Sequence, residues 1–195
     1  MWDERYANDE YFYGTAPNDF LRDNAARIPK GRVLCLADGE GRNGVWLAAQ
    51  GYEVTSVDLS AVGLEKTQKL AASRNVSVNT VQADLAEYEI QSDSWEGVVA
   101  IFCHLPAAVR HRLYPRVAAG LRSGGVLLLE LYTPKQIEFG TGGPRDLDLL
   151  ASLDDLRQDL SGLQFAIAQE IEREIHEGNH HFGHSAVVQI LGTKL

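Results

Sequence analysis

The sequence has little of several features that mark specialised classes of protein. It contains two cysteines, one methionine and six prolines in 195 residues, so neither a disulfide scaffold nor a proline-rich chain fits. Its apolar runs are short, and none reaches the roughly 20 residues that a membrane-spanning helix needs. The first twenty residues carry many charges and no apolar secretory segment, which predicts a cytoplasmic protein without a membrane partner.

Positive charge is scarce as well. The chain has 18 Lys and Arg against 27 Asp and Glu, a formal net charge of −9, and no long basic block. A field of this sign repels phosphate backbones, so no nucleic-acid partner is expected. Apolar residues make up 45% and charged residues 23%, the usual mixture for one globular domain. We therefore expect a single domain over residues 1–195, and the sequence does not indicate its oligomeric state.

The two cysteines, Cys35 and Cys103, both lie in apolar runs that resemble strands. In a reducing compartment a buried cysteine behaves as a small hydrophobic residue. We expect no disulfide and no chemistry from either thiol.

Strand-like and helix-like segments alternate along most of the chain. The predicted strands cover residues 32–37, 52–60, 76–85, 95–105 and 123–132, and the predicted helices cover 43–50, 61–74 and 106–121. This alternation predicts an α/β fold with a mostly parallel sheet and helices on both faces. Residues 132–145 form a long loop, Ser152 caps a short helix over 153–160, and residues 163–195 form a terminal antiparallel hairpin joined at 177–179.

A glycine loop follows the first predicted strand. Gly39, Gly41 and Gly44 satisfy the pattern G-x-G-x-x-G between a strand and a helix. Glycine permits positive φ in such a turn and lets a ligand approach the backbone closely. Asp58 ends the second predicted strand 19 residues after Gly39, close to the offset at which a carboxylate reaches a ribose. The pattern predicts a nucleoside-type ligand.

Two ligand classes fit this loop, a dinucleotide and S-adenosylmethionine. Asp38 and Glu40 flank Gly39 and would oppose a pyrophosphate. S-adenosylmethionine carries an ammonium and a sulfonium, which tolerate carboxylates. The charges therefore favour S-adenosylmethionine over NAD.

Four further residues complete the predicted cofactor site. Asp84 ends the third predicted strand, at the edge of the sheet where open α/β folds bind ligands, and would accept a hydrogen bond from the adenine amino group. A helix cap or a solvated acid is the plainer alternative for Asp84. Asn43 follows the glycine loop, Leu59 follows Asp58, and Leu85 follows Asp84.

At these residues the sequence resembles the class I S-adenosylmethionine-dependent methyltransferases, most closely their tellurite-resistance and thiopurine-type small-molecule branch. The segments that carry the resemblance are "VLCLADGEGRNGVWLAAQGYEVTSVDLS", "QADL", "GVVAIFCHLP" and "LRSGGVLLLE".

The resemblance implies a Rossmann-like, seven-stranded, mostly parallel sheet whose last strand is reversed. It implies that Gly39 and Gly41 line the methionine part of the cofactor, that Asp58 holds the ribose, and that Asp84 and Leu85 meet the adenine. Phe102 would lie near the methyl group. The family more often has Gly-Cys or Gly-Ser where this chain has Ala37-Asp38.

The acceptor side has weaker signals. Methyl transfer from a sulfonium needs positioning and exclusion of water rather than a nucleophilic residue. His104 is the best-placed base if the acceptor is an N or O acid, although it could equally fix the loop by hydrogen bonds. Tyr132, after the fifth predicted strand, could face a small-molecule acceptor or play a plain loop role. An acceptor based on S, Se or Te would need no base.

Four histidines, His176, His180, His181 and His184, lie near the end of the chain. Consecutive histidines on a strand point to opposite faces, and no cysteine accompanies them. We expect hairpin surface here and no metal site.

Aromatic residues concentrate at the start of the chain. Five of the sixteen (3 Trp, 7 Tyr, 6 Phe) lie in the first thirteen positions, before a helix that Ala16-Pro17 would open. Residues 1–30 are either an arm packed on the sheet or a lid over the cofactor, with Tyr13 in contact with it and Gly14 as a hinge. Two other functions remain open from the sequence: an NAD-type oxidoreductase, and a module that binds S-adenosylmethionine without catalysis.

Overall fold

The computed structural model describes residues 2–178 and 180–195 as a single seven-stranded sheet with helices packed on it. The strands are β1 Arg32–Leu36, β2 Glu53–Asp58, β3 Asn79–Gln82, β4 Trp95–Ile101, β5 Leu121–Tyr132, β6 Gln164–Glu177 and β7 His181–Thr193. The α-helices are α1 Trp2–Tyr6, α2 Asp19–Asn24, α3 Arg42–Ala49, α4 Ala61–Ser73, α5 Ala107–Gly120 and α6 Leu153–Asp159. Short 3₁₀ turns are η1 Ala25–Arg27, η2 Pro134–Glu138 and η3 Leu147–Leu149.

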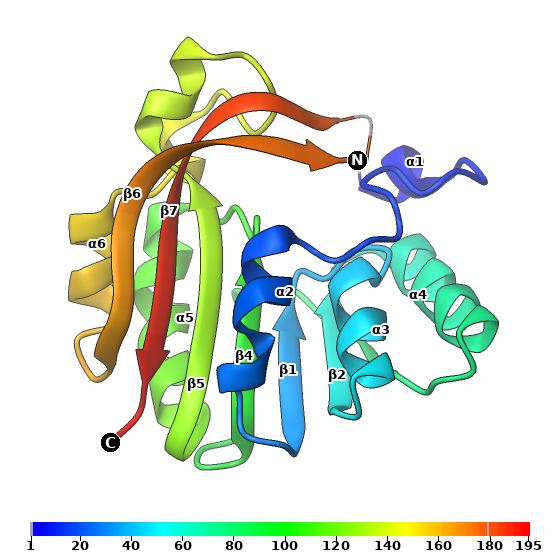
Figure 1. Ribbon diagram of the computed structural model, residues 1–195, viewed down its shortest axis with the longest axis horizontal. Coiled ribbons are helices and arrows are strands. Elements are labelled where there is room, and N and C mark those ends of the chain that lie inside the picture. Colours follow the sequence, from blue (N-terminus) through cyan, green and yellow to red (C-terminus); the bar gives the residue numbers. More distant parts are fainter. Residues whose placement is uncertain (1, 179) are drawn as a thin grey trace.

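The strand order is β3-β2-β1-β4-β5-β7-β6. Strands β1 to β5 are parallel, and β7 runs antiparallel to both β5 and β6. The α/β class, the helices on both faces and the terminal hairpin are therefore confirmed (Figure 1). Ser152 caps α6 through a reciprocal capping box with Asp155, as its position predicts.

Several element boundaries differ from the prediction by a few residues, and β4 ends at Ile101 rather than at residue 105. The third strand is shorter than expected and ends at Gln82, so Asp84 lies in the loop beyond it. The first long helix begins at Asp19 rather than at Ala16-Pro17, because the side chain of Asn18 accepts the Leu21 N–H and makes the better cap. The long loop after β5 contains the 3₁₀ turn η2.

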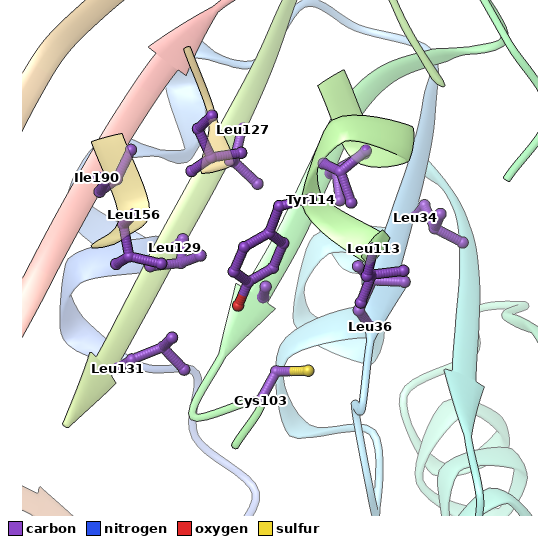
Figure 2. Packing of buried hydrophobic residues seen from close by; sticks show 14 of the residues in the cluster. Leu34, Leu36, Cys103, Leu113, Tyr114, Leu127, Leu129, Leu131, Leu156 and Ile190 are labelled. Carbon is purple, nitrogen blue, oxygen red and sulfur yellow. The ribbon is translucent and has the colours of Figure 1, made fainter. Parts of the chain in front are cut away.

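Two apolar layers enclose the sheet. Helices α2, α3 and α4 cover one face, and α5 and α6 cover the other (Figure 1). Figure 2 shows the second layer, where Tyr114 and Leu156 pack against the buried strand residues Leu34 and Leu129. Strands buried on both faces explain the near-continuous apolar runs in the sequence. None of the helices in the described part of the chain is both long and apolar enough to cross a bilayer.

The cysteines behave as expected. Both are free and buried, and they belong to opposite layers, Cys35 with α2 and α3 and Cys103 with α5. The sheet therefore separates the two thiols.

The terminal hairpin extends beyond the sheet. Strand β7 pairs with β5 only from Val187 to Thr193, and its first residues pair with β6 alone. The free part of the hairpin arches over the carboxyl ends of the strands towards α1 (Figure 1). The last residues of β6 and the first of β7 thus lie near the glycine loop.

A buried cluster of charges ties this hairpin to the rest of the fold. Glu130 of β5 is fully buried and accepts from Arg173, Asn18 and Gln189. Glu177 of β6 accepts from Asn18 at 2.7 Å. A second ion pair, between Arg42 of α3 and Glu177, has an N···O distance of 2.6 Å. Two carboxylates and two guanidinium groups balance the charge, which buried ions require.

We predict that Glu130→Ala lowers the free energy of unfolding by about 3–5 kcal/mol, because it leaves the Arg173 guanidinium partly buried without its carboxylate. Urea denaturation measures the change. Glu172→Ala is the matched control, since Glu172 pairs with Lys135 on the exposed face of the same hairpin and should change stability little. Equal losses of unfolding free energy in the two variants would show that the buried cluster contributes no more to stability than an exposed ion pair.

Candidate functional site

The main cavity lies at the carboxyl ends of the central strands, where parallel α/β sheets bind ligands. Its volume is about 630 Å³. Its walls come from the glycine loop, the segments after β2, β3 and β4, the amino-terminal arm (residues 2–15), the loop over residues 142–149 and His180 and His181 of the hairpin tip. The predicted site residues that line it are Tyr13, Asp38, Gly39, Glu40, Asn43, Asp58, Leu59, Asp84, Leu85, Phe102 and His104.

The glycine loop adopts left-handed backbone at three positions. Ala37, Gly39 and Gly41 have φ of 51°, 59° and 82°. Ala37 thus adopts a left-handed conformation although it has a Cβ. Glycine, which the resembling family more often has at this position, adopts this conformation more easily. A Cβ on Gly41 would lie 2.5 Å from Thr67 Cγ2, so Gly41 permits close packing of α3 on α4 rather than lining the cavity.

Asp58 lies at the end of β2, beside this loop. Its Oδ2 accepts the Gly39 N–H at 2.8 Å and its Oδ1 accepts the Ser60 N–H at 2.8 Å. Each carboxylate oxygen keeps a second lone pair, enough for ribose hydroxyls. Burial raises the pKa of Asp58, while the backbone donors oppose the shift. Asp58 is therefore oriented and buried as a ribose-binding carboxylate requires.

The two other carboxylates of the loop do not face the ligand freely, which corrects the charge argument against a dinucleotide. Glu40 pairs with Lys66 at 2.5 Å and accepts the Phe12 N–H at 2.8 Å. Asp38 accepts from Gly44 N–H and Ser56 Oγ, and burial raises its pKa to about 7. Asp38 nevertheless occupies the amino terminus of α3, the position in which a pyrophosphate would otherwise bind.

The residues after β2 and β3 that the sequence analysis singled out, Leu59, Asp84 and Leu85, line the cavity as well. Leu59 is 56% exposed and Leu85 is buried. Asp84 accepts the Ala86 N–H at 2.9 Å, a local turn contact that leaves its second oxygen for a ligand. Asn43 lies on the α3 side, where its Oδ1 accepts the Asn18 N–H at 2.9 Å and holds α2 in place.

Aromatic rings form another part of the cavity wall. Phe102, in a left-handed conformation with φ of 51°, packs 4.6 Å from the ring of Tyr132 and 4.6 Å from that of His181. Tyr132 is fully buried and stacks on His104 with ring centroids 5.5 Å apart. Tyr132 lies behind the lining residues and supports them, whereas His104, Phe102 and His181 contact the cavity.

The tautomer of His104 follows from its surroundings. Its Nδ1 is 3.1 Å from the Leu149 carbonyl oxygen, so Nδ1 carries the proton and donates. Burial lowers the pKa of His104 to about 4, which leaves the ring neutral at physiological pH. Nε2 is then an unprotonated acceptor without a partner among the described residues. His104 can accept a hydrogen bond from a ligand but is a weak base.

The interpretation of the late histidines as hairpin surface is wrong for His181. His181 is buried, its ring lies 4.4 Å from that of Tyr13, and burial holds its pKa well below the usual range. His180 is exposed, as strand alternation predicts, although it stacks on Phe12 at 3.5 Å. The length of the hairpin could have indicated that His181 lies in the cavity wall. A hairpin longer than its partner strand β5 must extend past the edge of the sheet.

The amino-terminal arm packs directly on the glycine loop. Tyr6 is buried, and a Cβ on Gly39 would lie 2.8 Å from its hydroxyl oxygen. Lys66 of α4 donates to the backbone carbonyls of Asn8 and Glu10 at 2.8 and 2.7 Å, which anchors the arm. Tyr6 is therefore a wall of the cavity that sequence reasoning did not single out.

Comparison with known proteins agrees with this geometry. A methyltransferase-domain family model matches residues 33–125. The uncharacterised methyltransferase YbaJ of Bacillus subtilis (strain 168) is 34% identical over 62 residues, which is 32% of this chain and 24% of YbaJ. The match thus spans about a quarter of the length of that curated relative.

Solved structures share the fold at low identity. TehB from Haemophilus influenzae superposes with a TM-score of 0.77 and 20% identity, over 100% of this chain and 68% of TehB. The glycopeptide N-methyltransferase MtfA, solved with S-adenosylmethionine, gives 0.64 and 22%, over 92% of this chain and 95% of MtfA. The fold is that of the class I S-adenosylmethionine-dependent methyltransferases. Residues 33–125 match the methyltransferase-domain model, and MtfA, which shares the fold, holds S-adenosylmethionine in its own structure.

We predict that Ala37→Gly raises the free energy of unfolding by about 1 kcal/mol, because glycine relieves the left-handed strain at φ 51°. Ala48→Gly, in the last turn of α3, is the matched control and should lower it by up to about 1 kcal/mol. Chemical denaturation measures both. Destabilisation by Ala37→Gly comparable to that by Ala48→Gly would contradict the strained loop.

Proposed function

We propose that this protein transfers the methyl group of S-adenosylmethionine to a small-molecule acceptor. One observation carries the proposal: the buried Asp58 carboxylate and the aromatic rings of Phe102 and His181 line the same cavity. A buried carboxylate suits a ribose, and aromatic rings suit an acceptor held away from water. The cavity is of a size that encloses small ligands.

The residues present fit the cofactor. Asp58 would hold the ribose, Asp84 and Leu85 would meet the adenine, and Gly39 would let the methionine part approach the backbone. When bound, S-adenosylmethionine supplies a methyl group that its sulfonium already activates. The chain's own task is then to align the acceptor and to exclude water, which reduces the barrier by positioning.

His104 would position the acceptor rather than remove its proton. Its Nε2 accepts a hydrogen bond, and a pKa of about 4 makes the ring a poor proton acceptor at neutral pH. This arrangement favours acceptors that react without a strong base, such as S, Se or Te nucleophiles or a neutral amine. The glycopeptide N-methyltransferase MtfA, which shares the fold, is by its name an enzyme that methylates nitrogen.

The proposal is tested by parallel calorimetric titrations with S-adenosylmethionine, S-adenosylhomocysteine and NAD, followed by turnover assays over thiol, amine and hydroxyl acceptors. We expect micromolar binding of S-adenosylmethionine, about −8 kcal/mol, and no measurable binding of NAD. Tighter binding of NAD would support an oxidoreductase instead. Binding of S-adenosylmethionine without turnover of any acceptor would support a non-catalytic module.

We also propose that the arm, residues 2–15, is a lid over the cofactor. Phe12 stacks on His180, and a Cβ on Gly178 would lie 2.6 Å from the Tyr13 carbonyl carbon, so arm and hairpin tip meet closely across the cavity. Gly14, with φ of 73°, follows as a candidate hinge.

Removal of residues 1–15 should leave a domain that unfolds cooperatively and binds S-adenosylmethionine at least tenfold more weakly, about 1.4 kcal/mol, because the cavity loses a wall. Calorimetry and urea denaturation measure the two properties. Equal affinity in the truncated protein would exclude the lid. Loss of cooperative unfolding would show that the arm is part of the hydrophobic core.

A further inference from the structure

Lys66 of α4 is buried, although lysine side chains almost always lie at the surface. Its side chain is only 8% exposed. The ammonium donates to two backbone carbonyl oxygens of the arm, that of Asn8 at 2.8 Å and that of Glu10 at 2.7 Å. Its third short contact is the ion pair with Glu40 Oε1, at an N···O distance of 2.5 Å. An ammonium has three protons, and these three acceptors account for all of them.

Glu40 connects the same part of the arm to the glycine loop. It lies between Gly39 and Gly41, and its side chain is also buried. Its second oxygen, Oε2, accepts the Phe12 N–H at 2.8 Å. Residues 8–12 of the arm are therefore bound from two elements at once, by Lys66 from α4 and by Glu40 from the glycine loop.

The arm can leave this pair of charges without separating them. Lys66 and Glu40 both belong to the body of the domain, and each neutralises the other whether or not the arm is in place. Release of residues 8–12 thus exchanges backbone hydrogen bonds for bonds to water, at a modest cost in free energy. Removal of one partner from a buried ion pair would cost far more. The contact is therefore suited to reversible opening.

The residues that follow the bound segment line the cavity. Phe12 stacks on His180 with ring centroids 3.5 Å apart, and the Tyr13 ring lies 4.4 Å from that of His181. The position of these two arm residues depends on the hydrogen bonds of residues 8–12, which directly precede them. Lys66 does not belong to the described residues that line the cavity, so it acts on the cavity only through the arm.

We propose that Lys66 is a positioning residue that latches the arm, so that release of the arm from Lys66 governs how fast the cofactor enters and leaves the cavity. This inference rests on the proposed function, since it assumes that S-adenosylmethionine occupies the cavity. A closed lid slows entry and exit alike, because the ligand passes only while the lid is open. A weaker latch raises the open fraction and should therefore raise both rates.

The first test needs no ligand. Glutamyl endopeptidase cleaves after Glu10, whose exposed backbone carbonyl accepts from Lys66. The variant that combines Lys66→Met with Glu40→Gln removes the latch and leaves no unpaired buried charge. Cleavage after Glu10 should be about tenfold faster in it, because the rate follows the open fraction. Lys69→Met, on the exposed side of the same helix, is the matched control and should leave the rate unchanged.

A milder variant keeps the test valid if the double substitution prevents folding. The Tyr11 hydroxyl donates to the Lys66 carbonyl oxygen at 3.2 Å, and the Tyr11 ring lies 4.9 Å from the ammonium. Tyr11→Phe removes this hydrogen bond and retains the ring, the ion pair and the charges. It should raise cleavage after Glu10 by a few-fold.

The second test measures the rates of binding and release of S-adenosylmethionine by surface plasmon resonance. Relative to Glu40→Gln alone, the double variant should show both rates raised about tenfold, so that the dissociation constant changes less than either rate. A merely structural role for Lys66 would raise the release rate and leave the binding rate unchanged or lower. That result would overturn the inference.

Unchanged cleavage after Glu10 in both the double variant and Tyr11→Phe would also overturn the latch, and the proposed function would stand. Failure of the unaltered protein to bind S-adenosylmethionine would instead overturn the proposed function, and with it the part of this inference that concerns the cofactor.

Discussion

The buried ion pair between Arg42 and Glu177 joins residues 135 positions apart in the chain. One lies directly after the glycine loop and the other at the tip of the terminal hairpin. Through Asn18, Glu130 and Arg173 the same cluster also binds the helix α2 and the strand β5. Buried charges tolerate few arrangements, because each must be paired and hydrogen-bonded. The cluster therefore specifies where the hairpin crosses the sheet edge, and with it the shape of the cavity.

Burial also determines which groups in the cavity are charged. Asp58 accepts the Gly39 N–H of the glycine loop, and Arg42 is the first residue of α3 directly after that loop. The two histidines of the aromatic wall are neutral, since burial lowers the pKa of His104 to about 4 and that of His181 further. An uncharged wall repels neither a sulfonium nor a soft nucleophile. Charged and uncharged side chains thus line the same cavity.

Much of this arrangement was predictable because it is local. The apolar run of β1, the glycine loop and Asp58 follow one another within a short stretch of sequence. The order strand, turn and second strand is enough to predict that they lie together. The pairing of Asp38 and Glu40 was not predictable, for the opposite reason. Their partners, Ser56 and Lys66, come from other elements, so adjacency in sequence did not reveal that these carboxylates are occupied.

The sequence by itself determined the α/β class, the strand and helix order, and the carboxylate at the end of β2, since hydrophobic periodicity and glycine spacing act over a few residues. Only the tertiary structure decided that His181 is a cavity wall, that Tyr6 packs on the loop, and that Arg42 keeps an unpaired nitrogen. Each of these depends on a contact between distant segments. The path of a hairpin beyond its sheet and the pairing of buried charges arise from packing, which no local pattern encodes.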